Sequence, residues 1–188
     1  MNVLKTVLLL PGIALLFSAC KKDKKEEVRN DNETITTMIV KFRPAGSGGG
    51  ADLQYQYDDP DGPGGAAATK DVITLAPNKL YIVDILLLDK TKTPVDTVSK
   101  EVAAEANAHR FYYTPSAGSD VSVILASEDH NGDPLGITSL WTTYNPNPSG
   151  KMLITLRHYA HNGKGPGDTV NSDKSSTDIE VEFDTRVQ

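Results

Sequence analysis

The sequence predicts an all-β fold, an Ig-like antiparallel β-sandwich of about eight strands with one short crossover helix. Apolar and polar residues alternate through most of the chain, which is the period of a half-buried strand. Clusters of glycine, proline, asparagine and aspartate separate these runs, as turns between strands require. Helical spacing occurs in one segment, so a sandwich core is built mainly from strands.

The predicted strands cover residues 37–42, 53–57, 80–88, 121–125, 136–144, 152–159 and 179–187. The run 80–88 is apolar on both faces apart from Asp84, which predicts a central strand covered on both sides. The last run alternates most clearly, and it predicts one core face and one solvent face. The core face holds Ile179, Val181, Phe183 and Val187, and the solvent face holds Asp178, Glu180, Glu182, Asp184 and Arg186.

The strand rhythm breaks at residues 96–108. Val98, Val102 and Ala106 recur there at helical spacing behind Pro94, which predicts the crossover helix between the sheets. Glycine supplies positive φ and proline removes a ladder donor in the predicted turns, which lie at residues 45–50, 58–65, 131–132 and 145–150. A closed barrel of the same strands is the alternative fold.

The N-terminus has the layout of a lipoprotein signal. Lys5 precedes the apolar run 7–17, which is about half as long as a spanning helix needs. The small residues Ser18 and Ala19 then precede Cys20, the position that a lipobox acylates. The predicted organisation is a signal peptide at 1–19, a lipidated cysteine with a charged tether at 20–33, and a single β-sandwich domain at 34–188. An ordinary signal peptide cut before a chance cysteine is the alternative.

Cys20 is the only cysteine in the chain. Once it is acylated, no thiol is left for a disulfide, a thiolate metal site or a cysteine nucleophile. A domain of about 155 residues can bury close to 70% of its unfolded surface, so one hydrophobic core is enough to hold it together.

The charge of the chain argues against a nucleic-acid partner. The formal net charge is −6, and four of the basic residues lie in the tether segment 21–27, so the folded part is more acidic than the whole. An acidic domain without a clustered lysine or arginine face is a poor match for a phosphate backbone.

Two sets of residues are candidate binding sites. The acidic loop with Asp58, Asp59 and Asp61 and the turn with Asp129 and Asp133 offer the oxygen ligands that calcium prefers, although turns select the same residue types. In a separate place, Trp141 and Tyr144 lie in a threonine-rich strand before an Asn/Pro loop. An exposed aromatic pair there would stack on a sugar ring, and the alternative makes Trp141 a core residue.

The sequence contains no catalytic motif, so a non-enzymatic protein is predicted. It lacks Gly-x-Ser-x-Gly, His-Glu-x-x-His and the phosphate loop of nucleotide-binding proteins. His158 and His161 are three residues apart at the end of a strand, where alternate residues point to opposite faces, so we do not expect them to converge on a metal. His109 follows the predicted helix and is expected to interact with its C-terminal dipole.

Several segments, taken in order, resemble a family of small outer-membrane lipoproteins of the Bacteroidota. They are residues 33–37, 59–65, 74–78, 101–113, 131–136, 153–158 and 177–181. The resemblance implies attachment to the outer membrane. Lys22-Asp23 and Glu26-Glu27 are similar to the charged tag that directs such lipoproteins to the cell surface. Some similar sequences carry the label of a type 1 periplasmic binding fold, but that fold is a pair of α/β lobes, and this chain has too few helices for it.

Together these features predict a lipid-anchored protein of the outer membrane, with exposure at the cell surface favoured and attachment to the periplasmic leaflet as the alternative. The expected function is a non-catalytic binding or adhesion module with a protein or glycan ligand. A structural or accessory subunit of a larger envelope complex is the alternative. The expected partners are therefore the membrane, through the anchor, and an external ligand.

Overall fold

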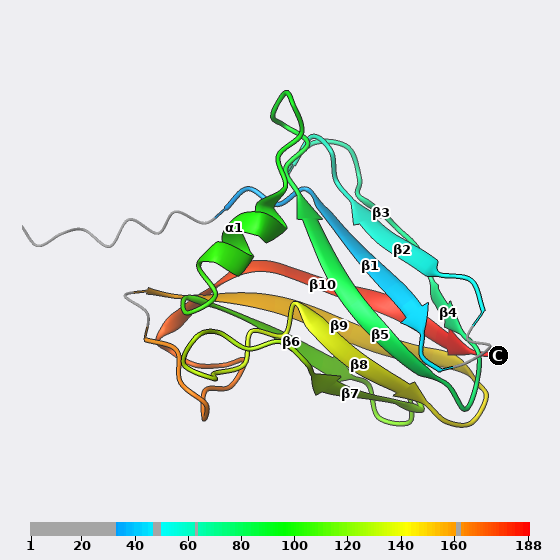
Figure 1. Ribbon diagram of the computed structural model, residues 1–188. Helices are drawn as coiled ribbons and strands as arrows, with labels where there is room; N and C mark the ends of the chain where they lie inside the picture. The colour runs from blue at the N-terminus through cyan, green and yellow to red at the C-terminus, as the bar shows by residue number, and fades with distance from the viewer. Residues whose placement is uncertain (1–32, 47–49, 63, 161–162) are drawn as a thin grey trace, which may run out of the picture.

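The structure is a computed structural model that describes residues 33–46, 50–62, 64–160 and 163–188. It is an all-β sandwich with one short helix, as predicted (Figure 1). The strands are β1 (Thr37–Pro44), β2 (Leu53–Asp58), β3 (Thr69–Lys70), β4 (Ile73–Leu75), β5 (Leu80–Leu88), β6 (His109–Pro115), β7 (Val121–Leu125), β8 (Thr138–Thr143), β9 (Asn147–Tyr159) and β10 (Ser175–Val187).

The strands form two sheets that share no strand. The six-stranded sheet has the order β3-β2-β1-β5-β8-β7, and the four-stranded sheet has the order β4-β10-β9-β6. The closed-barrel alternative therefore does not hold. The pairing is antiparallel except between β10 and β4, which run parallel.

Three strands were not predicted, and one predicted turn is wrong. The strands β3 and β4, of two and three residues, are too short to show a period, and β6 begins directly after the helical region without a clear apolar alternation in its sequence. β9 begins at Asn147, so most of the predicted turn 145–150 belongs to a strand that contains Pro148. The prediction for β5 is half right, because one face is buried and the other, with Asp84, is only half-buried.

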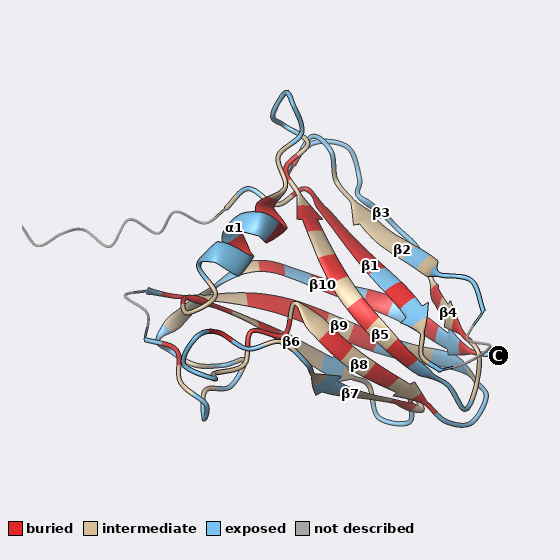
Figure 2. Ribbon diagram, in the orientation of Figure 1, coloured by how far each residue is buried: buried red, intermediate tan, exposed pale blue. Residues whose placement is uncertain are grey.

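The core lies between the sheets, where the buried faces of β1, β5, β9 and β10 meet (Figure 2). Trp141 is fully buried at its centre. Its ring makes edge contacts with Phe42, at 5.1 Å between centroids, and with Tyr113, at 5.8 Å. Such T-shaped pairs are favourable beyond the area that they bury.

Helix α1 (Val98–Ala104) connects β5 to β6 and so crosses from one sheet to the other, as predicted. It is shorter than the predicted 96–108, and its buried residues Val98 and Val102 join the core. The helix lies over one end of the sandwich, beside the start of β10 and the end of β9 (Figure 1). Among the described residues, no helix has the length and apolar character needed to span a bilayer.

Candidate functional site

Beside α1, three neighbouring strands of the four-stranded sheet bring together two histidines and one aspartate. His109 opens β6, His158 lies opposite it on β9, and Asp178 comes from β10 on the other side of β9. His158 is an even number of residues from Met152, Ile154 and Leu156. Because alternate residues of a strand point to the same face, it belongs to the core face of β9. We call His109, His158 and Asp178 the His/Asp centre.

Asp178 reaches this centre through a β-bulge. The pairing of β10 with β9 passes from Thr177 opposite Arg157 to Ile179 opposite Leu156, so Asp178 has no residue across from it. Such a bulge inserts one residue and redirects a side chain. The Asp178 side chain is 0% exposed. The prediction that Asp178 lies on the solvent face is therefore wrong, because that prediction assumed unbroken alternation.

The three side chains converge without hydrogen bonding to one another. Nε2 of His109 lies 3.6 Å from Oδ2 of Asp178, and Nδ1 of His158 lies 4.0 Å from Oδ1. The imidazole rings are stacked, with centroids 4.7 Å apart. Nε2 of His109 and both carboxylate oxygens of Asp178 are buried without a hydrogen-bond partner. Buried polar atoms are paired in the great majority of cases, so three unpaired atoms in one place require an explanation.

The protonation of His109 follows from its surroundings. Its Nδ1 lies 3.1 Å from the carbonyl oxygen of Glu105, and because a carbonyl only accepts, Nδ1 carries the proton. Burial lowers the pKa of His109 to about 4, against the effect of that hydrogen bond, so the ring is neutral at pH 7. The expected interaction with the end of α1 is thus a hydrogen bond from a neutral ring, and Nε2 presents a lone pair to Asp178.

Two buried carboxylates have unusually high proton affinity. Burial raises the pKa of Asp178 to about 7, although the positive charge of Arg157 opposes this shift. Burial also raises the pKa of Glu33 to about 7, and the nearby carboxylates of Asp178, Glu101 and Glu105 add to it. Oε2 of Glu33 is likewise buried without a hydrogen-bond partner.

The donor atoms are close enough to share one ion. The ligand atoms of His109, His158 and Asp178 lie within 4.8 Å of one another, and the same holds for Glu33, Glu105 and His109. Neutral imidazole nitrogens and carboxylate oxygens are common ligands of divalent transition metals. The arrangement is thus chemically able to hold a cation between two imidazoles and a carboxylate.

One half of the predicted calcium site is filled by a lysine. Nζ of Lys164 lies 2.9 Å from Oδ2 of Asp129 and donates to the carbonyl oxygens of Ala106, His109 and Pro134. Both charged side chains are 1% exposed. Burial opposes ionisation of Asp129, but the Lys164 contact and two backbone hydrogen bonds outweigh it and lower the pKa of Asp129. An internal ammonium therefore occupies the oxygen-lined position.

The backbone N–H groups of Asn131 and Asp133 both donate to Oδ1 of Asp129, which closes the turn. Asp133 in turn accepts through its backbone carbonyl from the N–H of Asp129. These contacts are those of a turn, which was the alternative interpretation of this segment.

The other half of the predicted calcium site is held by local contacts. Asp58 accepts from Thr37 and pairs with Lys90, each at 2.6 Å. Asp61 accepts from the backbone N–H of Ala66 at 2.8 Å, and Oδ2 of Asp59 accepts from the hydroxyl of Tyr57 at 3.5 Å. Within the described ranges, none of Asp58, Asp59, Asp61, Asp129 and Asp133 belongs to a group with metal-ligand geometry.

The predicted aromatic pair is divided between the core and the surface. Trp141 is 0% exposed and its Nε1 donates to Ser139 at 2.9 Å, so the core interpretation is the one that the geometry supports. Tyr144 is 46% exposed and shares a hydrogen bond with Ser122. The two rings do not form a common platform for a sugar. Cys20 and His161 lie outside the described residues.

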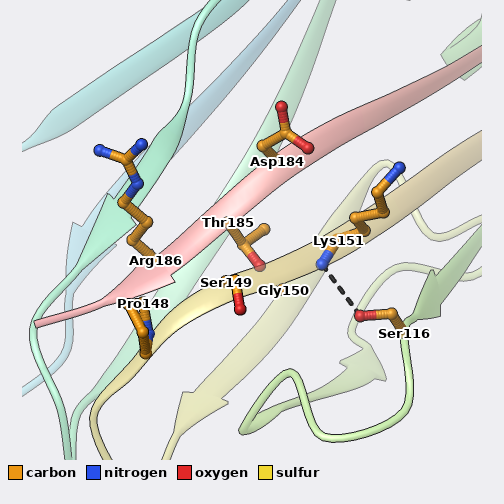
Figure 3. A pocket seen from close by; sticks show the side chains of 8 residues that line it. All are labelled: Ser116, Pro148, Ser149, Gly150, Lys151, Asp184, Thr185 and Arg186. Atoms are coloured by element: carbon orange, nitrogen blue, oxygen red, sulfur yellow. Dashed lines mark hydrogen bonds between the residues drawn. The ribbon is translucent and has the colours of Figure 1, made fainter.

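A hollow of ≈ 300 Å³ lies at the opposite end of β9 and β10 (Figure 3). It is lined by residues of both strands and by Ser116, whose hydroxyl accepts from the backbone N–H of Lys151 at 3.0 Å. None of the residues predicted to form a site lines it. We therefore take the His/Asp centre, where two imidazoles and a buried carboxylate converge, as the candidate site.

Sequence reasoning missed this centre, although part of its signal was present. His158 alternates in step with the apolar residues of its strand, which indicates a core position, but the pairing of β6 with β9 is needed to place His109 beside it.

Comparisons with protein-family models, with curated proteins and with solved structures found no match to this chain.

Proposed function

We propose that this chain is a lipoprotein of the outer membrane, exposed at the cell surface, whose sandwich domain is a non-catalytic binding module. The support for the anchor is the apolar run 7–17 followed by Ser18, Ala19 and the only cysteine of the chain, Cys20. Two or more acyl chains on one cysteine make release from a bilayer negligible, since each buried CH₂ contributes about 0.8 kcal/mol. The support for the binding role comes from the folded domain.

The observation that carries the binding role is the unpaired carboxylate of Asp178 facing the unpaired Nε2 of His109. Leaving a buried polar group without a partner costs about 1–3 kcal/mol, and more for a charged group. A ligand that satisfies these atoms removes that cost, so the fold is more stable with the ligand than without it. The His/Asp centre is accordingly the binding site that we assign to the module.

Membrane fractionation of the Cys20→Ala variant tests the anchor. The variant is expected to be exported but recovered in the soluble fraction, whereas the unchanged chain stays with the outer membrane and incorporates a palmitate analogue. Protease added to intact cells should digest the unchanged chain if it faces outward. An unlabelled wild-type protein, or a Cys20→Ala variant that stays membrane-bound, contradicts the proposal.

One observation favours the second candidate function, an accessory subunit of an envelope complex. β7 is an edge strand of the six-stranded sheet, and its Ile124 is 65% exposed. Exposed edges that carry large apolar side chains are suited to contact with another chain. Pull-down from membranes distinguishes the two functions, because a stoichiometric protein partner that is lost in Ile124→Lys favours the accessory subunit.

A further inference from the structure

We propose that the His/Asp centre binds a divalent transition-metal ion of the zinc class. The ligands are Nε2 of His109, a ring nitrogen of His158 and a carboxylate oxygen of Asp178. This inference rests on the proposed function for its site, and it adds the chemical class of the ligand.

The donor set selects the class of ion. Two imidazoles with one carboxylate suit zinc and its neighbours in the first transition row. Calcium and magnesium prefer oxygen ligands and bind six or more of them, which this centre does not offer. The centre contains no thiolate, so ions that require sulfur are not favoured.

The distances are those of a site slightly wider than its loaded form. Ligand atoms about 2.0–2.2 Å from a tetrahedral zinc ion lie about 3.3–3.5 Å from one another. Nε2 of His109 lies 3.6 Å from Oδ2 of Asp178 and Nδ1 of His158 lies 4.0 Å from Oδ1, and all the ligand atoms lie within 4.8 Å of one another, so the three side chains have to move closer together to share one ion. A shared proton fits less well, because a hydrogen bond would draw His109 and Asp178 to about 3 Å.

His109 is already oriented for binding. Metal-binding histidines typically donate their second ring N–H to a carbonyl or carboxylate, which fixes the tautomer. Nδ1 of His109 donates to the carbonyl oxygen of Glu105 in this way and leaves Nε2 directed at Asp178. The ring of His158 is stacked on that of His109, because the pairing of β6 with β9 sets the two residues opposite each other, and it has to turn before both rings direct a nitrogen at one ion.

The cations near the centre are engaged elsewhere. The ammonium of Lys164 is bound by Asp129 and three carbonyl oxygens. The guanidinium of Arg157, the positive charge that acts on Asp178, donates to Ser172, Ser175 and Thr177. Besides a proton, an external cation is therefore the group that can pair with the buried carboxylate.

Glu33 lies beside the centre on the His109 side, in a separate group with Glu105 and His109. Its Oε2 is buried without a hydrogen-bond partner, and its carboxylate lies within 4.8 Å of a ring nitrogen of His109. Glu33 directly precedes the predicted domain boundary at residue 34, so this contact would join the start of the domain to its buried centre. We expect Glu33 to complete the coordination that the three other ligands begin.

The test is a titration of the chain that carries Cys20→Ala, in which no thiol competes for metal. Cobalt(II) is added first, because its visible absorption reports tetrahedral coordination, and zinc is then used to displace it. We expect one ion per chain and no competition from millimolar magnesium or calcium. Asp178→Asn and His158→Gln should each weaken binding at least a hundredfold, and Glu33→Gln should weaken it about tenfold.

His130→Gln is the matched control, since His130 is an exposed histidine outside the centre. It should leave the affinity unchanged, and circular dichroism in chelator should show that every variant is folded. Absence of one-to-one binding to the folded chain overturns the inference, as does full affinity in both Asp178→Asn and His158→Gln. Full affinity in Glu33→Gln removes Glu33 from the ligand set. Fractionation of the Cys20→Ala variant is independent of metal, so failure of the anchor and failure of the metal site can be told apart.

Discussion

Nε2 of His109 lies 3.6 Å from Oδ2 of Asp178, and neither atom has a hydrogen-bond partner. The two residues come from β6 and β10, which are separated by β9, and only the bulge at Asp178 lets them meet. A lone pair and a carboxylate held face to face in a buried site repel each other until a cation or proton lies between them. This relationship is the basis of the binding role proposed for the domain.

Removing the charge of Asp178 should have opposite effects on the free and the metal-loaded protein. In chelator, Asp178→Asn relieves the cost of an unpaired carboxylate and offers an amide N–H to His109, so unfolding free energy should rise by about 1 kcal/mol. In zinc at a hundred times the dissociation constant of the unchanged protein, that protein should gain about 2.7 kcal/mol and the variant less than about 0.5 kcal/mol. Thermal melts in both conditions measure this. A variant that is as strongly stabilised by zinc as the parent contradicts it.

Trp141→Ala should destabilise the domain by about 3–5 kcal/mol, because it empties a packed position in the centre of the core. Tyr144→Ala is the control from the same region. Its side chain is half exposed, so it should cost less than about 1 kcal/mol. Urea unfolding measures both values. If Trp141→Ala costs as little as the control, the tryptophan does not have the core role described above.

Lys164 and Asp129 should behave as a coupled pair. Removing either charge leaves the other buried without a partner, and each of Lys164→Met and Asp129→Asn is expected to cost about 3 kcal/mol. The double variant should cost clearly less than the sum of the two single changes. A double-mutant cycle in urea gives the coupling energy, and strict additivity would show that the two charges do not interact.

The stability contributed by Asp58 should depend on pH. Burial opposes its ionisation, but the contacts with Lys90 and Thr37 outweigh this and lower the pKa of Asp58 below its unfolded value, near 3.9. Its contribution is therefore fully present above about pH 4 and is lost as the pH falls through the lower, folded pKa. We expect Asp58→Asn to cost about 1 kcal/mol at pH 7 and progressively less as the pH falls below the unfolded pKa. A cost that is constant across this range would contradict the assignment.

Calcium should leave the melting temperature unchanged. Asp129 is neutralised by Lys164 and Asp58 by Lys90, so two of the predicted ligands already have a cation. Melts in millimolar calcium and in excess chelator check this. A shift of several degrees that Asp59→Ala abolishes would restore a calcium site on the loop at 58–61.

The alternation of apolar and polar residues was enough to predict the sandwich, because burial of one face dictates it in each long strand. Alternation failed to predict segments that are strands because they hydrogen-bond to a partner strand, and not because they bury one face. The two residues of β3 are both exposed, and β9 begins inside an Asn/Pro segment that composition assigns to a turn. A partner strand supplies the hydrogen bonds in both cases, and the local sequence does not show which strand that is.

The candidate site was harder to predict than the fold. A period of two placed Asp178 on the solvent face, and one inserted residue in the register reversed that result. His109 was expected to interact with the helix end, which it does through Nδ1, while the function of Nε2 depends on strands more than forty residues away in sequence. The cation that fills the Asp129 turn, Lys164, is likewise distant in the chain.

The metal site can be observed directly in a crystal structure of the zinc-soaked protein, with anomalous diffraction recorded on both sides of the zinc absorption edge. We expect one edge-dependent peak between Nε2 of His109, His158 and Asp178, about 2.0–2.2 Å from each ligand atom. If the centre gives no such peak in protein that has been exposed to zinc, and His109 instead hydrogen-bonds to a protonated Asp178, the His/Asp centre does not bind zinc.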